Sequence, residues 1–184
     1  MRNFYWADIH FNHQRIPLFC PNTRPFTSMK QMNETLIQKW NSRITNEDNI
    51  RFLGDFAFGD KELFSGFFNR LNGKKHLIIG NHDPQTTLSL GWLSINHYTE
   101  IQDSGCHVIL SHYPLADWNR KNRGSIHLYG HVHGKPVQTD EANMNSYDVG
   151  VDNNNPEPLL LREIIDILEK ANRYNGPKIL NKKR

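Results

Sequence analysis

The sequence predicts one α/β domain, and three observations support this prediction. The chain has 184 residues, a length at which a single hydrophobic core can bury most of the apolar surface. Five short apolar runs, rich in β-branched and aromatic residues, predict buried strands. Apolar residues three and four positions apart predict amphipathic helices between them. No repeat or linker divides the sequence, so we expect a single domain over residues 1–175 and a basic tail over residues 176–184.

The composition is that of an ordinary globular protein, with 37% hydrophobic and 22% charged residues. A formal net charge of +3 permits an anionic substrate without requiring one. Cys20 and Cys106 are too few for a disulfide scaffold and form no CxxC motif. No segment approaches the ~18 apolar residues of a membrane helix, and none reads as a signal peptide, so we expect a cytoplasmic protein without membrane association.

The first predicted strand, residues 4–7, ends at Asp8-Ile9-His10. Residues at i and i+2 of an extended backbone point to the same side, so Asp8 and His10 could share a site. The alternative is a turn with a capping aspartate and an exposed histidine. Residues 11–27 then form a loop whose length is typical of functional or disordered segments.

Two amphipathic helices flank the second predicted strand. The first begins at Ser28, where a Ser-x-x-Gln pattern predicts a capping box. Its buried face is predicted by apolar residues at helical spacing: Met29, Met32, Leu36, Ile37, Trp40 and Ile44. The second helix follows Asp60, an expected N-cap. The strand between them, residues 50–53, ends at Gly54-Asp55, where the glycine lets the backbone turn so that the carboxylate projects into a site.

Three further strands also end in polar residues. They are residues 75–79 before Gly80-Asn81-His82-Asp83, residues 106–110 before Ser111-His112, and residues 126–129 before Gly130-His131-Val132-His133-Gly134. The segment from 84 to 100 is predicted as a loop with a short helical piece around residues 88–93. Residues 147–151 and 159–161 predict short strands, followed by a helix that carries Ile164, Ile165, Ile167 and Leu168.

The strand ends carry seven possible metal ligands: Asp8, His10, Asp55, Asn81, His112, His131 and His133. Imidazole nitrogens mixed with carboxylate and carboxamide oxygens, without thiolate, suit Mn²⁺, Fe, Zn²⁺ or Ni²⁺ better than Ca²⁺ or a structural zinc. Seven ligands are too many for one ion that must also bind water and substrate. They fit two ions sharing one carboxylate, and paired ions ~3.5–4 Å apart are a common device for hydrolysing phosphate esters. Each histidine alone could be structural; their joint placement favours the dinuclear site.

The order of these motifs resembles the calcineurin-like metallophosphoesterase superfamily. The motifs are Asp-x-His, Gly-Asp, Gly-Asn-His-Asp, a lone His after a strand, and Gly-His-x-His-Gly, and they cover residues 4 to about 152. Single motifs of this kind carry little weight, whereas all five in order are highly specific. The segments 6–13 and 112–115 are most similar to the small, single-domain bacterial and phage members.

The resemblance implies a four-layer αββα sandwich of two mixed β-sheets flanked by helices, with the metal site at the strand-end loops of one edge. It implies two divalent ions, for which Mn²⁺ is the expected metal and Fe, Zn²⁺ or Ni²⁺ are the alternatives. It also implies in-line attack on phosphorus by a hydroxide that bridges the two ions. The implied ligands are Asp8, His10 and His133 for one ion and Asn81, His112 and His131 for the other, with Asp55 bridging.

Two residues of the Gly-Asn-His-Asp motif bind no ion in this scheme. The resemblance implies that His82 protonates the leaving alkoxide or steadies the transition state, a role that suits an imidazole. Asp83 could orient His82 by accepting its other ring N–H, or could cap the following loop. His82 and Asp55 are therefore the predicted catalytic residues, and Asp83 is expected to support them without contacting the ions or the substrate.

Four residues outside the motifs are candidates for contact with the substrate: His13, Arg24, Arg120 and Arg123. A solvated side chain is the alternative for each arginine, and a surface loop residue is the alternative for His13. Basic and aromatic residues are too few around Trp118 to predict a groove for nucleic acid.

The expected function is hydrolysis of phosphodiesters of nucleotides or small molecules. A phosphomonoesterase or nuclease of the same fold, and an inactive binding scaffold, are the alternatives. Inactive scaffolds typically lose a ligand or the proton donor, and this sequence keeps all of them, which favours an enzyme. The sequence does not predict the oligomeric state.

Overall fold

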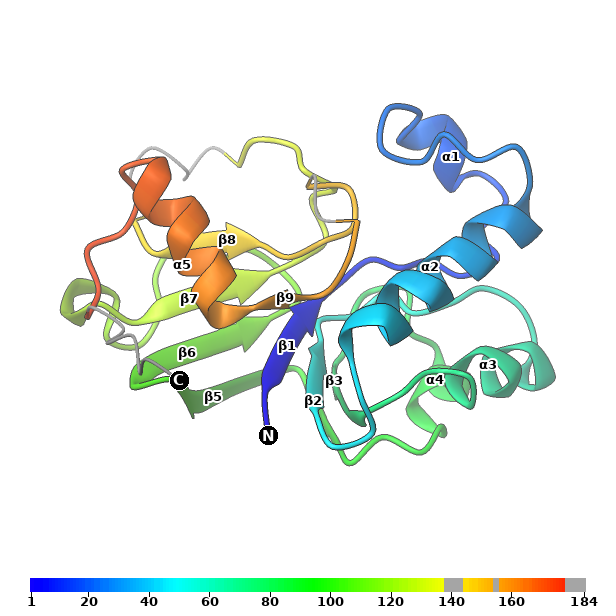
Figure 1. Cartoon of the computed structure of the whole chain (residues 1–184), viewed down its shortest axis with the longest axis horizontal. Coiled ribbons are helices and arrows are strands. Elements are labelled where there is room, and N and C mark those ends of the chain that lie inside the picture. The colour runs from blue at the N-terminus through cyan, green and yellow to red at the C-terminus, as the bar shows by residue number, and fades with distance from the viewer. Residues whose placement is uncertain (138–143, 154–155, 178–184) are drawn as a thin grey trace.

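The computed structural model describes residues 1–137, 144–153 and 156–177, which form two mixed β-sheets and their flanking helices (Figure 1). The strand order is β4-β3-β2-β1-β9 in the first sheet and β5-β6-β7-β8 in the second. All neighbours pair in parallel except β9 with β1 and β5 with β6. The predicted architecture of two mixed sheets flanked by helices is confirmed.

The strands are β1 (Asn3–Trp6), β2 (Asn49–Phe52), β3 (Lys74–Ile78), β4 (Ser94–Asn96), β5 (Tyr98–Asp103), β6 (Cys106–Ser111), β7 (Ile126–Tyr129), β8 (Ser146–Asp148) and β9 (Leu159–Leu160). The helices are α1 (Ile16–Phe19), α2 (Met29–Arg43), α3 (Lys61–Phe68), α4 (Gln85–Leu88) and α5 (Leu161–Lys170), with a short 3-10 helix at Lys121–Arg123.

The outer face of the first sheet packs against α2 and α3. Side chains alternate along a strand, so Phe4, Trp6 and Phe52 all lie on this face. They are fully buried in one cluster with Trp40 of α2 and Phe64 of α3. Ser28 and Asp60 cap these helices as predicted, because each accepts a backbone N–H of the first turn.

The two sheets share a second core between them. Tyr5 and Ile78 from the first sheet pack in one buried cluster with Val108 and Leu128 from the second and Ile164 of α5. This face-to-face packing joins the two halves of the chain. It also places the ends of their parallel strands side by side.

Backbone hydrogen bonds tie the loops at these strand ends together. Asp8 donates to the carbonyl of Gly54 at 3.0 Å within the first sheet, and Gly130 donates to that of His112 at 2.9 Å within the second. Val151 donates to the carbonyl of Ala7 at 3.1 Å and so links the two sheets. The predicted motifs therefore meet at one edge of the molecule.

Two segments differ from the predictions. The 11–27 loop contains α1, and the 84–100 segment contains α4, β4 and the first half of β5 in place of a helix around residues 88–93. β5 is an edge strand that pairs with β6 through a turn at Ser104-Gly105, and its outward residues are exposed polar or aromatic side chains. An edge strand of this kind has no continuous apolar run to identify it.

The predicted basic tail lies mostly outside the described residues, which end at residue 177. Within the described ranges, no helix combines the length and the apolar composition needed to span a membrane.

His127 on β7 is an acid-sensitive group. Its side chain is fully buried, 5.1 Å from the ring of Trp118. Its Nε2–H donates to Ser111 Oγ at 2.8 Å, since that hydroxyl donates its own hydrogen to the carbonyl of Tyr113. Burial, and after it the charge of Lys121, lowers the pKa of His127 from 6.5 to about 3.

We expect His127→Gln to reduce the loss of stability in acid. A group with a lowered folded pKa stabilises the fold above its unfolded pKa, here 6.5, and loses that contribution as the pH falls towards 3. From about pH 7 to pH 4, the wild-type free energy of unfolding should fall by on the order of 3 kcal/mol more than that of the variant. Urea unfolding across this range measures the difference, with His97→Gln at an exposed position as control. Equal slopes in all three proteins would contradict it.

Candidate metal centre

Five of the seven predicted ligands have the left-handed backbone conformation, which is uncommon for residues with a side chain. They are Asp8 (φ 57°), His10 (51°), Asp55 (62°), His131 (73°) and His133 (52°). Such residues each cost roughly 1–3 kcal/mol and concentrate at functional sites. The expectation of an extended backbone at Asp8 and His10 was wrong, because β1 ends at Trp6 and the chain turns after it.

Asn81, His112 and His131 form one group of possible ligand atoms. Asn81 Oδ1 lies 3.0 Å from His112 Nε2 and 2.9 Å from His131 Nδ1. Atoms bound at right angles to one ion, each ~2.0–2.1 Å from it, are also about 3 Å apart. His112 Nδ1–H donates to the carbonyl of Leu53 at 2.7 Å, which leaves Nε2 unprotonated and able to bind a metal.

Asp8, His10 and His133 form a second, adjoining group. One possible ligand atom from each lies within 4.8 Å of the others, and the rings of His10 and His133 stack 5.1 Å apart. Asp55 lies between the groups, with Oδ2 3.5 Å from His10 Nε2 and 3.6 Å from His112 Nε2. The structure thus brings all seven predicted ligands together.

Several of these atoms are buried without a hydrogen-bond partner among the described residues. They are Asp8 Oδ1, both ring nitrogens of His10, and Asp55 Oδ2. A buried polar atom without a partner costs about 1–3 kcal/mol, and more when it is charged. A bound cation would satisfy these atoms, so the residues present fit a metal centre.

The charge of the site also fits two divalent cations. Among the described residues, one guanidinium, that of Arg24, is buried at the site. Five of the described carboxylates lie in or beside the site: Asp8, Asp55, Asp83, Asp148 and Asp152. Two divalent cations would balance the four net negative charges. Burial raises the pKa of Asp8 and lowers that of His10, and the carboxylates of Asp148 and Asp55 raise that of Asp8 further. A neutral imidazole is the form that binds metal.

Two glycines allow the ligand loops to approach closely. A Cβ at Gly80 would lie 2.3 Å from Asp55 Oδ1, and one at Gly54 would lie 2.6 Å from His112 Nδ1. Gly54 also has a φ of 92°, in accord with the sharp turn expected before Asp55.

Asp83 holds the backbone of the Gly-Asp loop. Its carboxylate accepts the backbone N–H groups of Asp55 at 2.9 Å, Phe56 at 2.9 Å and Gly80 at 2.8 Å. Both of its oxygens are used in this way. The two roles considered from the sequence, orienting the His82 ring and capping the following loop, are therefore wrong.

Arg24 is not available to a substrate. Its side chain is only 1% exposed and donates to the carbonyl oxygens of Asp8 and Ile9 and to both carboxylate oxygens of Asp152. Neither a substrate contact nor a solvated side chain is compatible with this burial, so both interpretations of Arg24 were wrong.

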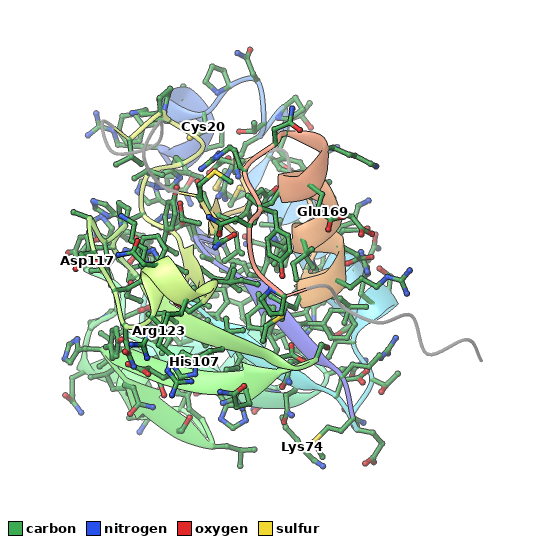
Figure 2. The ribbon with its side chains drawn as sticks, turned by 90° about the vertical axis from the view of Figure 1, so that its left-hand side faces the viewer. Cys20, Lys74, His107, Asp117, Arg123 and Glu169 are labelled. Carbon is green, nitrogen blue, oxygen red and sulfur yellow. The ribbon has the colours of Figure 1, made fainter. Side chains whose placement is uncertain are left out.

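Arg120 and Arg123 lie at the opposite edge of the second sheet from the ligands. They lie at the two ends of the short 3-10 segment that precedes β7. His131 follows the other end of β7. With His107 near the start of β6 they line a cavity of about 390 Å³, and Figure 2 shows Arg123 beside His107. Their predicted contact with the substrate is wrong, because they lie at the end of β7 away from His131. The loop sequence does not indicate at which end of the strands the loop lies.

Aromatic rings surround the opening of the site. His13 lies near the ligands, with its ring 4.2 Å from that of Phe58 and 5.5 Å from that of His10, and its contact with a substrate stays a prediction. Phe58 is also 5.4 Å from His82, and both line a cavity of about 340 Å³. Tyr113 is 48% exposed and lies 4.5 Å from His131. No pattern in the sequence indicates that Tyr113 and Phe58 lie at the opening of the site.

Asp152 is a site residue that the sequence reasoning missed. Its Oδ2 lies 2.7 Å from His133 Nδ1. It follows the apolar residues Val149 and Val151 directly, which is the same pattern of an apolar run before a carboxylate that identified Asp8 and Asp55. That signal could have found it.

No family model matches the chain. The uncharacterized protein MJ1445 of Methanocaldococcus jannaschii is 31% identical over 179 residues, covering 93% of this chain and 94% of the relative. The gene 66 protein of Mycobacterium phage L5 is 23% identical and covers 81% of this chain and 86% of that protein.

Among solved structures, the protein of unknown function AQ665 from Aquifex aeolicus has a TM-score of 0.73 and 24% identity. The match covers 90% of this chain and 98% of that one, so the two share a fold. The chain belongs to the same family as the uncharacterized protein MJ1445, of which it covers 94% at 31% identity.

Proposed function

We propose that the protein is a divalent-metal-dependent phosphoesterase that hydrolyses phosphodiesters of nucleotides or similar small molecules. The observation that carries this proposal is the pair of adjoining ligand groups with Asp55 between them. An isolated buried histidine or aspartate has many structural explanations. Two ligand groups that share one carboxylate are the arrangement used for hydrolysing phosphate esters.

Asp8, His10 and His133 would hold one ion, Asn81, His112 and His131 the other, and Asp55 both. Such a pair of ions lowers the pKa of bound water and stabilises negative charge on phosphoryl oxygens. Mn²⁺ is the expected ion, because mixed nitrogen and oxygen ligands without thiolate suit it, and Fe, Zn²⁺ or Ni²⁺ are the alternatives.

His82 would handle the proton of the leaving group, and its position beside the ligands supports this role. Its backbone N–H donates to Asp55 Oδ1 at 2.8 Å, which fixes the turn, while its ring lies 5.7 Å from that of His10. The residue is exposed, and its ring makes no hydrogen bond to any described residue. Its nitrogens can therefore donate a proton to the leaving oxygen of a bound ester.

The surroundings of the site favour a diester with a planar group. Tyr113 and Phe58 present aromatic rings at the opening, against which a base or an aryl group can stack. The second negative charge of a monoester would be stabilised further by a cationic side chain in addition to the ions. Arg24 is already paired with Asp152, and Arg120 lies at the other edge of the sheet.

We expect hydrolysis to depend on added metal. Protein stripped with a chelator and reloaded with Mn²⁺ should hydrolyse an aryl phosphodiester, whereas the stripped protein should not. Its melting temperature should also rise on reloading, because an ion that binds only the folded state stabilises it. A rate independent of metal would contradict the proposal.

A substrate panel separates the alternative activities. It includes an aryl monoester, cyclic and linear nucleotides, and single-stranded nucleic acid. Hydrolysis of the monoester alone would assign a phosphomonoesterase, and a strong preference for nucleic acid would assign a nuclease. Bound metal without turnover of any substrate would favour a binding scaffold.

A further inference from the structure

We propose that Arg24 and Asp152 are positioning residues, which hold His133 and the Asp8–His10 turn in the geometry that binds one metal ion. This inference rests on the proposed metal-dependent function and adds two residues that lie outside the five motifs. Both side chains are buried, with 1% and 5% of the residue exposed, so they act through the ligands rather than on a substrate.

Arg24 braces the turn that carries two of the ligands. Its Nη1 donates to the carbonyl of Ile9 at 2.7 Å, and its Nη2 donates to that of Asp8. Asp8 and His10 on either side of Ile9 have positive φ, so this turn is a conformation that the chain adopts only when its surroundings enforce it. The planar fork of a guanidinium reaches the two carbonyls from two separate nitrogens in a fixed geometry, whereas an ammonium group has a single nitrogen on a flexible stem.

Asp152 sets the protonation of His133. Its Oδ2 lies 2.7 Å from His133 Nδ1, and an ionised carboxylate only accepts hydrogen bonds. The ring proton of His133 is therefore on Nδ1, and the lone pair of Nε2 is left for the ion. A carboxylate behind a metal-binding histidine typically fixes both its tautomer and its ring orientation in this way.

The two residues work as one unit. Asp152 accepts from Arg24 Nε at 2.9 Å and from Nη2 at 2.8 Å, and Thr23 Oγ adds a bond of 2.6 Å to Oδ1. The positive charge of Arg24 is thus neutralised by Asp152, so that a cation beside a metal centre does not repel the ion. The chain from Asp8 through Arg24 and Asp152 to His133 joins ligands that are far apart in sequence.

Calorimetric titration of the full-length, metal-free protein with Mn²⁺ tests the inference. In Asp152→Asn and Arg24→Lys, one of two binding steps should weaken by about 10–100-fold, the usual effect of removing a group behind a ligand, while the other step persists. Arg70→Gln, which breaks an exposed pair with Glu34, is the control and should leave both steps unchanged. Thr23→Val is a milder variant that should weaken the same step by a few-fold even if the other two do not fold.

Nitrogen-15 NMR of the metal-free protein gives a second readout that a merely structural role would not change. His133 should be protonated on Nδ1 in the wild type and should lose this single tautomer in Asp152→Asn. Unchanged affinities together with an unchanged tautomer would overturn this inference but not the proposed function. Failure of the wild type to bind any divalent ion would overturn the proposed function and this inference with it.

Discussion

Replacing Asp55 by asparagine should lower phosphodiester hydrolysis by about 10³-fold or more, because a ligand shared by two ions supplies several kcal/mol of stabilisation. Asp55 Oδ2 is buried 3.5 Å from His10 Nε2 and 3.6 Å from His112 Nε2, with no hydrogen-bond partner among the described residues. Asparagine has the same size but presents a neutral amide there. Steady-state rates with Mn²⁺ in excess, together with the metal content of the variant, measure the effect.

The asparagine variant should also keep the fold. Asp55 Oδ1 accepts the backbone N–H of His82 at 2.8 Å, and a carboxamide oxygen can accept the same bond. Asp166→Asn makes the identical change at an exposed position of α5 and is the matched control, with rate and melting temperature expected at wild-type values. A near wild-type rate in Asp55→Asn would falsify the dinuclear assignment.

The ligands could be predicted because their signals are local. A buried parallel strand is a short apolar run, and a polar residue directly after it lies at the edge of the sheet. Their convergence is not local, since Asn81 and His131 are 50 residues apart in sequence and 2.9 Å apart in space. Only the order of the motifs, through its resemblance to a known superfamily, indicated that convergence before the structure.

The arginines show where sequence reasoning fails. Arg24, Arg120 and Arg123 all lie in polar loops and look alike in the sequence. Arg24 is buried because Asp152, 128 residues later, neutralises it, whereas the loop with Arg120 and Arg123 folds to the other edge of the sheet. Contacts of such separation leave no periodic pattern near either partner. The left-handed backbone of the ligands is invisible for the same reason, since no glycine marks those positions.

His82→Ala should separate metal binding from catalysis. The ring of His82 lies outside both ligand groups, 5.7 Å from that of His10, and the backbone N–H that bonds Asp55 is kept in the variant. We therefore expect nearly unchanged affinity for Mn²⁺ and a loss of turnover of about 10²–10⁴-fold, the usual contribution of a general acid. Calorimetric titration and steady-state kinetics on one preparation measure the two effects. His97→Ala, at an exposed position, is the matched control.

The leaving group decides what His82 contributes. If its imidazole protonates the departing oxygen, the loss in His82→Ala should be large for an alkyl alcohol and small for an acidic phenol, which leaves without a proton. If it only stabilises charge on the phosphoryl group, the loss should be equal for both. Loss of one bound ion in the variant would instead make His82 a ligand and would require the division of roles within Gly80-Asn81-His82-Asp83 to be redrawn.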